Sequence, residues 1–519
     1  MALLSLSPLA SAATEPEGFP KAGEAHHTTI APIQEKTLEN GLRVIAAVRP
    51  GLPIFVAEVI IKSGAETDPP KLGGLAHLTA DVLNQGTKTR TAPQIATEVE
   101  ALGAKLETEG HWDSATVKLT GLSDYTAPGL AILADVIKNP TFAKEEVERV
   151  RRQTMDQLKL GLDTPGTVAR MAVNRVSLGN SPYAHPETGT LGSLARITRK
   201  DIVALHQQEY RPSNAILVVS GPLAAEHVFA EAAKAFGDWK ESTTTDPAAK
   251  AKAHSPISVW PDAEAAKKSP PGKSPSGINV WPNAQADEKS APTAASVAPK
   301  PRSVLIDMPT AGQAAVYIGC SSIPRNAADY YAGKVANALL GGGYSSWLNQ
   351  EVRVKRGLSY GAASGLDTRR SSGLFLATAQ TKNESAAEVV NVMRTQVDRL
   401  GNAPAAPEYI KTRQAVLTGA FARDLETNDG YVKRLAELAL YGLPLDTMDH
   451  TVESIEAVDA EAIRAFSEHH LPSSILNVVV AGSAKQALEP LKKLIPQIEV
   501  IPQNAADYDS LTLKKSGHK

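Results

Sequence analysis

One segment of the chain occurs twice: residues 211–221 read RPSNAILVVSG, and residues 471–482 read LPSSILNVVVAG. Each copy begins with a Pro-Ser turn and continues as a run of branched aliphatic residues, which is typical of a buried strand. Each copy also follows an amphipathic helical pattern, which begins near residue 197 in the first case and near residue 455 in the second. The repetition indicates two homologous halves of about 200–250 residues, the usual size of a domain.

Strand and helix patterns are mixed within each half. In the first half, residues 42–61 and 105–122 have the short apolar runs of strands. Apolar residues recur at helical spacing elsewhere, and a Pro in the first turn marks one of the helix starts. We expect helices over residues 75–84, 93–102, 127–137 and 144–160. These patterns predict an α+β fold in which each half is an antiparallel sheet with helices packed on one face.

The segment between the halves has a different composition. Residues 242–302 are rich in Ala, Pro, Lys and Ser, with few residues that could form a core. Within this segment VWPDAEA at 259–265 recurs as VWPNAQA at 280–286. We interpret it as a linker with an internal duplication; alternatively, each Trp packs against one half. The predicted domains are therefore residues 28–241 and 303–500, flanked by a flexible segment at 1–27 and a tail at 501–519.

The first residues resemble a secretory signal. Residues 3–9 are mostly apolar, and Ala-Ser-Ala at 10–12 matches the small-x-small pattern of a cleavage site. The usual positive charge at the start is missing, because the first basic residue is Lys21. We interpret the segment as the remnant of a signal peptide and predict export to a bacterial periplasm, with a cytoplasmic location as the alternative.

Charge and cysteine content exclude several classes of function. With 54 basic and 56 acidic residues, the formal net charge is −2, so no strong field attracts nucleic acid or an acidic membrane. No internal apolar run approaches the length needed to span a bilayer. Cys320 is the single cysteine, which rules out an internal disulfide and a cysteine metal cluster.

The predicted helix near residue 75 carries a histidine and a carboxylate one turn apart. Residues 74–81 read GLAHLTAD. In the inverted zinc motif H-x-x-E-H, two histidines one turn apart bind the metal and the Glu between them acts on water. Here the corresponding positions are His77, Ala80 and Asp81. One ligand is kept, while the general base is replaced by a methyl group and the second histidine by a carboxylate.

Further landmarks in both halves strengthen this comparison. They are NGLRV at 40–44, SPY at 181–183, GT at 189–190, LGGGYSS at 340–346 and RVKRGLSY at 353–360. With these segments in this order, residues 35–485 resemble the pitrilysin/insulinase-type zinc peptidases, the inverzincins. The resemblance implies two similar α+β halves that face each other like a clamshell.

The resemblance also implies a third zinc ligand, a Glu on a later helix of the first half. Its position falls at Gln157, or at Asp156 if the register slips by one residue. An amide is a poor zinc ligand. Ala80, Asp81 and Gln157 together therefore predict that this chain binds no zinc. A separate metal site made by His77, Asp81 and Asp156 is the alternative.

The second half retains the other part of the family's site. Family members use an Arg and a following Tyr to reach the substrate, and these match Arg353 and Tyr360. We expect a helix over residues 345–355, a glycine cap at Gly357 and a strand over 358–362, which would bring the two side chains together. Both can donate hydrogen bonds to a peptide carbonyl. The alternative is a surface Arg and a core Tyr.

These observations predict a non-catalytic, substrate-binding subunit of a heterodimeric zinc metallopeptidase. A homologous partner subunit with an intact H-x-x-E-H would hold the zinc, in a heterodimer or a dimer of heterodimers. This chain, inactive alone, would supply Arg353 and Tyr360, and the substrate would be an extended peptide. Two alternatives remain: a proteolytically inactive structural scaffold of the same fold, and a single-chain metallopeptidase with altered ligands.

Overall fold

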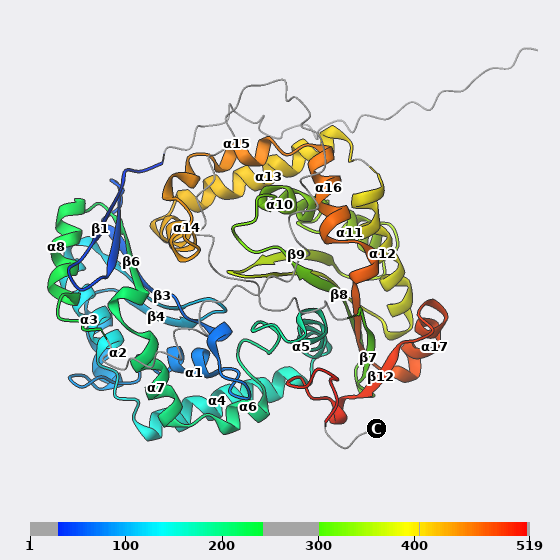
Figure 1. The fold of residues 1–519 in the computed structure, drawn as a ribbon, viewed down its shortest axis with the longest axis horizontal. Helices are drawn as coiled ribbons and strands as arrows, with labels where there is room; N and C mark the ends of the chain where they lie inside the picture. The colour runs from blue at the N-terminus through cyan, green and yellow to red at the C-terminus, as the bar shows by residue number, and fades with distance from the viewer. Residues whose placement is uncertain (1–29, 242–299, 404, 516–519) are drawn as a thin grey trace, which may run out of the picture.

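The structure is a computed structural model that describes residues 30–241, 300–403 and 405–515. Figure 1 shows two halves beside each other, the first coloured blue to green and the second green to red. The predicted signal segment and all but the last three residues of the predicted linker lie outside the described residues. Their boundaries stay predictions.

The first half is built on a six-stranded mixed sheet. β6 lies in the interior of the sheet, parallel to β2 and antiparallel to β3, and the remaining pairs are antiparallel. All seven residues of β6 are buried, as its unbroken aliphatic run predicts. The strand order is β1-β2-β6-β3-β5-β4, with bounds β1 Ile33–Thr37, β2 Arg43–Val48, β3 Ile54–Ile61, β4 Lys105–Gly110, β5 Ala115–Leu122 and β6 Ala215–Gly221.

The predicted helices of the first half are present, with ends shifted by one to three residues. α2 has Pro93 in its first turn, as predicted, and a capping box between Thr91 and Gln94 precedes it. The helix with the His77 motif is shorter than expected and ends at Asp81. The bounds are α1 Leu75–Asp81, α2 Ala92–Ala101, α3 Thr126–Lys138, α4 Lys144–Leu162, α5 Pro165–Leu178, α6 Leu191–Arg196, α7 Arg199–Glu209 and α8 Ala225–Phe236.

The second half repeats this plan. Its strands are ordered β12-β7-β11-β8-β10-β9, with bounds β7 Ser303–Asp307, β8 Ala314–Ser322, β9 Ala362–Thr368, β10 Gly373–Thr381, β11 Asn477–Gly482 and β12 Glu499–Pro502. Its helices are α10 Tyr330–Leu340, α11 Trp347–Asn349, α12 Ala386–Asn402, α13 Pro407–Leu425, α14 Asn428–Leu440, α15 Thr451–Glu456, α16 Ala460–His470 and α17 Ala484–Leu494. β11 is parallel to β7 and antiparallel to β8, the arrangement that β6 has in the first half. The two copies of the repeated segment therefore occupy equivalent central positions, which confirms the predicted internal repeat.

Each half covers one face of its sheet with its own helices and the other face with a helix from the opposite half. α5 of the first half packs on β8 and β11, where Val168, Ala172 and Val173 join the core of the second sheet. α14 of the second half packs on β3 and β6, where Val432 and Leu435 join the core of the first sheet. This exchange makes both halves parts of one folded unit.

The α+β class and the two halves are therefore confirmed, with two differences from the expectation. The sheets are mixed, because a strand from late in each half inserts beside an early strand. Helices lie on both faces of each sheet, because of the exchange. Among the described residues no helix is long and apolar enough to cross a bilayer.

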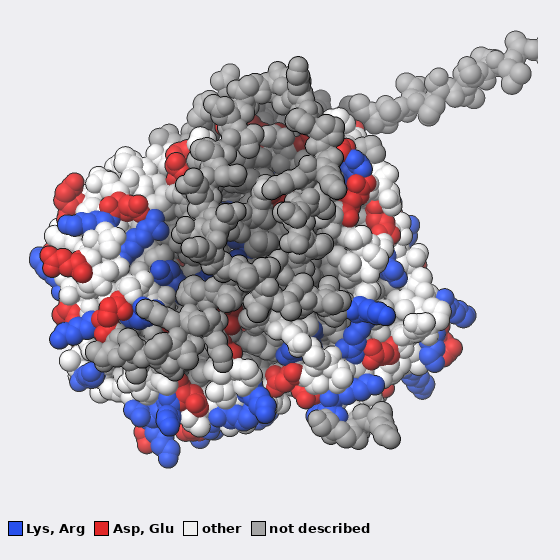
Figure 2. Space-filling view, viewed as in Figure 1, with Lys and Arg blue, Asp and Glu red and all other residues white. Residues whose placement is uncertain are grey.

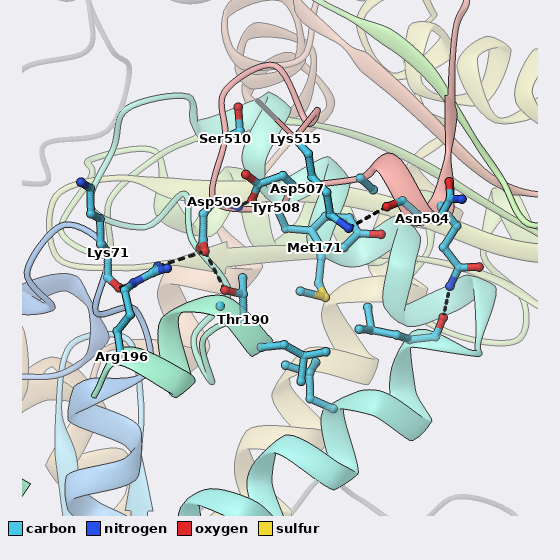
Figure 3. Close-up of a pocket in the computed structure, with 16 residues that line it drawn as sticks. Lys71, Met171, Thr190, Arg196, Asn504, Asp507, Tyr508, Asp509, Ser510 and Lys515 are labelled. Carbon is cyan, nitrogen blue, oxygen red and sulfur yellow. Dashed lines mark hydrogen bonds and ion pairs between the residues drawn. The ribbon is translucent and has the colours of Figure 1, made fainter. Parts of the chain in front are cut away.

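Residues 501–515, predicted to belong to a tail, instead continue the fold. After β12 the chain crosses to the first half, where Leu513 is fully buried. Figure 3 shows Asp509 accepting a hydrogen bond from Thr190 Oγ1 at 2.6 Å, with Arg196 Nη2 at 3.7 Å from the same carboxylate. Arg175 also donates to the Tyr508 carbonyl at 2.9 Å. The segment has too little periodic structure for a sequence pattern to reveal it, and its order comes from these contacts with the other half.

Candidate functional site

The helix that carries His77 is fixed by a carboxylate at its start. Asp68 accepts hydrogen bonds from the backbone N–H groups of Gly74, Leu75 and Ala76, at 2.6–3.2 Å. These N–H groups have no partner inside the helix, and a carboxylate at this end also interacts favourably with the helix dipole. Gly74 itself has φ 92°, a conformation that favours glycine. α1 therefore begins at a defined residue, and the position of His77 follows from it.

His77 lies between the edge strand β4 and Asp81. Its Nδ1 is 3.1 Å from the Gly110 carbonyl oxygen, and its Nε2 is 3.5 Å from Asp81 Oδ2. Burial raises the pKa of Asp81, while the nearby His77 lowers it. Ala80 is fully buried. The motif thus brings one imidazole and one carboxylate together, with a methyl group where H-x-x-E-H has its base.

The third predicted position does not complete a zinc site. Gln157 and Asp156 both lie on the exposed face of α4, and Asp156 pairs with Lys159 at 2.8 Å. Within residues 30–241, 300–403 and 405–515, no group of three His, Cys, Asp or Glu side chains is arranged to hold a metal ion. A structural zinc site needs four donors and a catalytic one needs three. The donors present at His77 therefore do not fit zinc.

A chamber of about 1070 Å³ separates the two halves beside this helix. From the first half it is lined by residues of the β4–β5 turn and by Glu187, and from the second by Arg369, Glu437 and Tyr441. Burial raises the pKa of Glu187, while His77 and Arg369 oppose the rise. The chamber is large enough for several residues of an extended peptide, and β4 forms one edge of the first sheet beside α1.

Asp113 joins the two halves at the wall of the chamber. It is 2% exposed, and its carboxylate accepts from Tyr183 Oη at 2.5 Å, Tyr441 Oη at 3.1 Å and the backbone N–H of Arg370 at 3.0 Å. Tyr183 belongs to the same half, whereas Tyr441 and Arg370 come from the other. Three donors on one buried carboxylate meet its hydrogen-bonding needs and fix the relative position of the halves.

The turn between β9 and β10 inserts Arg369 next to Asp113. Its guanidinium carbon lies 4.2 Å from the centre of the Trp112 ring and 5.0 Å from that of Tyr183. Asp367 accepts from its Nη2 at 2.6 Å. Sequence reasoning noted Tyr183 as part of a landmark but missed Asp113, Arg369 and Tyr441. They are isolated charged or aromatic residues with no motif around them, so only the tertiary contacts identify them.

Arg353 and Tyr360 converge, as predicted, although the local structure differs. The guanidinium carbon of Arg353 lies 4.5 Å from the centre of the Tyr360 ring and 5.1 Å from that of Tyr344. Gly357 ends the helical segment with φ 62°, which confirms the predicted cap. The predicted strand at 358–362 is wrong, because β9 begins only at Ala362. Tyr360 therefore lies in a loop.

The Arg353–Tyr360 pair is open to solvent. Tyr360 is 87% exposed, which rules out the alternative of a core tyrosine. Among the described residues the Arg353 side chain has no hydrogen-bonding partner and contacts only the two rings. Its N–H groups and the Tyr360 hydroxyl are free to bind a ligand. Neither residue lines the chamber, and among the described residues no hydrogen bond, ion pair or ring contact joins the pair to His77.

Charge on the molecular surface is evenly mixed. Figure 2 shows acidic and basic side chains side by side over the visible described surface, in agreement with the net charge of −2. The features that could recognise a ligand are therefore the local ones described above.

Two sequence-family models match the chain. Residues 43–186 match the model described as insulinase (peptidase family M16), and residues 196–417 match the model described as peptidase M16 inactive domain. Together they span most of both halves. Glu187, which lines the chamber, lies in the short gap between the two matches.

Individual relatives agree with these models. An uncharacterized zinc protease of Streptomyces coelicolor is 23% identical over 463 residues, covering 88% of this chain and 92% of the relative. An uncharacterized zinc protease of Mycobacterium tuberculosis is 23% identical over 453 residues, covering 87% and 94%. Both alignments extend over nearly the full length of the relative.

Solved structures share the fold. A peptidase M16 inactive domain from Pseudomonas fluorescens superposes with a TM-score of 0.72 at 24% identity, covering 87% of this chain and 98% of the other. A protease from Helicobacter pylori gives a TM-score of 0.73 at 17% identity, covering 87% and 100%. The two halves and their arrangement are thus a known architecture.

Proposed function

Because the chain belongs to the insulinase-type peptidase family M16, we propose that it is the non-catalytic, substrate-binding subunit of a two-chain zinc metallopeptidase. The observation that carries this proposal is a contrast within the chain. The zinc motif at His77 lacks its base and two ligands, whereas Arg353 and Tyr360 are intact and adjacent, with Arg353 half-buried and Tyr360 exposed.

In this proposal the catalytic zinc belongs to a homologous partner with an intact H-x-x-E-H. The metal there would polarise the scissile carbonyl and activate water. Arg353 and the Tyr360 hydroxyl would donate hydrogen bonds to the peptide carbonyl, where negative charge develops during hydrolysis. The exposure of Tyr360 supports this role, because its hydroxyl must be accessible to a substrate bound by another chain.

The substrate would be an extended peptide. β4 is an edge strand with unpaired backbone groups on one side, and it runs beside the chamber and α1. Such an edge can bind a peptide by adding it to the sheet as a further strand. The carboxylates and guanidinium groups of the chamber wall would then contact its side chains.

The test is reconstitution with a homologous chain that has an intact H-x-x-E-H, using an internally quenched peptide. The purified chain alone should contain less than about 0.1 zinc per molecule and cleave nothing, and cleavage should appear on mixing. Arg353→Ala and Tyr360→Phe should each lower turnover about 10- to 1000-fold without changing assembly. The controls are Lys355→Ala, at an exposed cation two residues from Arg353, and Tyr409→Phe, at an exposed tyrosine of α13.

The same experiment decides between this proposal and its two alternatives. A structural scaffold would assemble stably yet give no cleavage with any partner. A single-chain enzyme with altered ligands would contain metal when purified alone and lose its activity in His77→Ala. Full turnover in both Arg353→Ala and Tyr360→Phe would refute the roles assigned to that pair.

Location in the periplasm is part of the proposal and rests on residues 1–12 alone. Fractionation of bacterial cells expressing the full chain with a carboxy-terminal tag tests it. A processed chain in the periplasmic fraction is the expected result, and an unprocessed chain in the cytoplasm would contradict it.

A further inference from the structure

A second cavity, separate from the chamber, lies inside the second half. It has a volume of about 200 Å³ and is enclosed by α10, α13, α14 and the turn Leu445–Met448. A volume of this size exceeds that of one or two waters and suits a small organic molecule. Its apolar wall is formed by Leu417, Phe421, Leu438, Met448 and Ile455.

Three cations line the same cavity, and two of them are paired. Arg325 is buried and donates from Nε to Glu437 Oε1 at 2.5 Å. Arg434 donates from Nη2 to Asp424 Oδ2 at 2.5 Å. These two carboxylates balance the two guanidinium groups. The third cation, Lys334, is left over.

Lys334 forms no hydrogen bond or ion pair in the described part of the chain, and its ammonium lies 5.9 Å from the centre of the Tyr330 ring. Burial lowers the pKa of this lysine, and the nearby Glu437 carboxylate opposes the shift. Glu437 also lies 3.6 Å from Nη1 of Arg434, so it is shared among the three cations. Three cations thus face two carboxylates, and a partly buried surplus of positive charge is costly. A bound anion would remove this surplus.

Arg434 provides a second unused donor. Its Nε is buried and has no hydrogen-bonding partner, although the rest of its guanidinium is paired. The Arg434 and Lys334 side chains both line the cavity, so an anion bound there lies beside two cations. A carboxylate has two oxygens, one for each of them.

We propose that this cavity binds a small carboxylic acid with an apolar body, through Lys334 and the guanidinium group of Arg434. The carboxylate supplies the missing negative charge, and the apolar body packs against Phe421, Leu438 and Met448. A free organic acid and the carboxy terminus of a peptide have this chemistry in common. The proposal is independent of the function assigned to Arg353 and Tyr360.

Isothermal titration calorimetry on the full chain tests the site with two acids and their amides. 3-Phenylpropionate represents a free acid, and N-acetylleucine represents a peptide carboxy terminus. 3-Phenylpropionamide and N-acetylleucinamide have nearly the same shape without the charge. At least one acid should bind, and its amide should bind at least about tenfold more weakly. Binding of N-acetylleucine alone would identify peptide termini as the source, and binding of both acids would identify small carboxylic acids in general.

Lys334→Met is the matching variant, because it keeps the length of the side chain and removes the charge. It should weaken binding of the acid about 10- to 100-fold, while its melting temperature without ligand stays equal or rises. Lys411→Met, at an exposed position of α13, should bind as the unmodified chain does. Failure of both acids to bind, equal binding of an acid and its amide, or full affinity in Lys334→Met would overturn the proposal. The comparison of acid with amide holds even if the variant does not fold.

Discussion

Arg370 of the second half forms an ion pair with Glu66 of the first: its Nη1 lies 2.9 Å from Glu66 Oε1. The same guanidinium donates from Nη2 to the carbonyl of Asp113 at 2.8 Å and to that of Lys62 at 3.2 Å. One side chain at the β9–β10 turn thus contacts three places on the other half. The closed arrangement of the chamber depends on it.

Arg370→Ala should therefore destabilise the closed molecule. The variant removes three hydrogen bonds across the halves. Because the pKa of Glu66 is raised to about 8 and the Arg370 side chain is 35% exposed, the expected loss is roughly 1–3 kcal/mol rather than that of a buried charged pair. The urea midpoint should fall, and small-angle scattering should show a larger radius of gyration. Arg149→Ala, which breaks the exposed pair with Glu146, is the control and should change the midpoint little. Equal changes of the urea midpoint in the two variants would show that Arg370 contributes no more to stability than an exposed ion pair does.

Glu66 should make stability depend on pH. Burial, with Asp113 nearby, raises the pKa of Glu66 to about 8, and Arg370 opposes the rise. Between the ordinary value of 4.5 and about 8, the folded state holds a proton that the unfolded state has lost. The free energy of unfolding should then fall as pH rises through this window, by up to ~1.4 kcal/mol per pH unit from this group.

Glu66→Gln should remove that contribution, because glutamine keeps an acceptor for Arg370 and does not titrate. Urea unfolding at several values between pH 5 and 9 measures the change. The slope should become shallower than in Glu98→Gln, a variant at an exposed carboxylate. Identical slopes would show that Glu66 titrates normally in the folded state.

Loss of the hydroxyl should lower stability clearly at one tyrosine and hardly at all at another. Tyr183 is 1% exposed and donates to Asp113, so Tyr183→Phe leaves a buried carboxylate short of a donor and should cost about 1–3 kcal/mol. Tyr360 is 87% exposed, so Tyr360→Phe should change stability by less than about 0.5 kcal/mol. Urea midpoints of the two variants check this. A large loss in Tyr360→Phe would mean that its effect on turnover is structural.

The close contact between β4 and α1 requires a glycine. A Cβ added at Gly110 would lie 2.5 Å from the Cα of His77, so Gly110→Ala must push the helix away from the strand, at a cost of about 1–3 kcal/mol. Gly365 in the edge strand β9 has open space around it, and Gly365→Ala should be neutral or slightly stabilising. Thermal unfolding compares the two. A neutral Gly110→Ala would indicate that α1 moves freely relative to β4.

Much of the local structure could be predicted from the sequence because it depends on neighbouring residues. The two copies of the Pro-Ser strand segment predicted equivalent central strands, and β6 and β11 are fully buried as expected. The helix start with Pro93 in its first turn and the glycine cap at Gly357 follow from backbone requirements that a few residues settle. The strand predicted around Tyr360 failed, because a short alternating run is a weak signal and the loop packs against Arg353 instead.

The sequence by itself determined the two-half plan, the strands and helices, and the loss of the zinc donors at Ala80, Asp81 and Gln157. Only the tertiary structure decided that α5 and α14 cross to the opposite sheets and that Asp113 receives donors from both halves. It also decided that Lys334 lines a cavity without forming an ion pair within the described part of the chain. The physical reason is the separation along the chain of the residues that are in contact. Periodicity and capping report contacts within a few residues, whereas these pairings join side chains tens to hundreds of positions apart. Single charged residues leave no pattern along the chain.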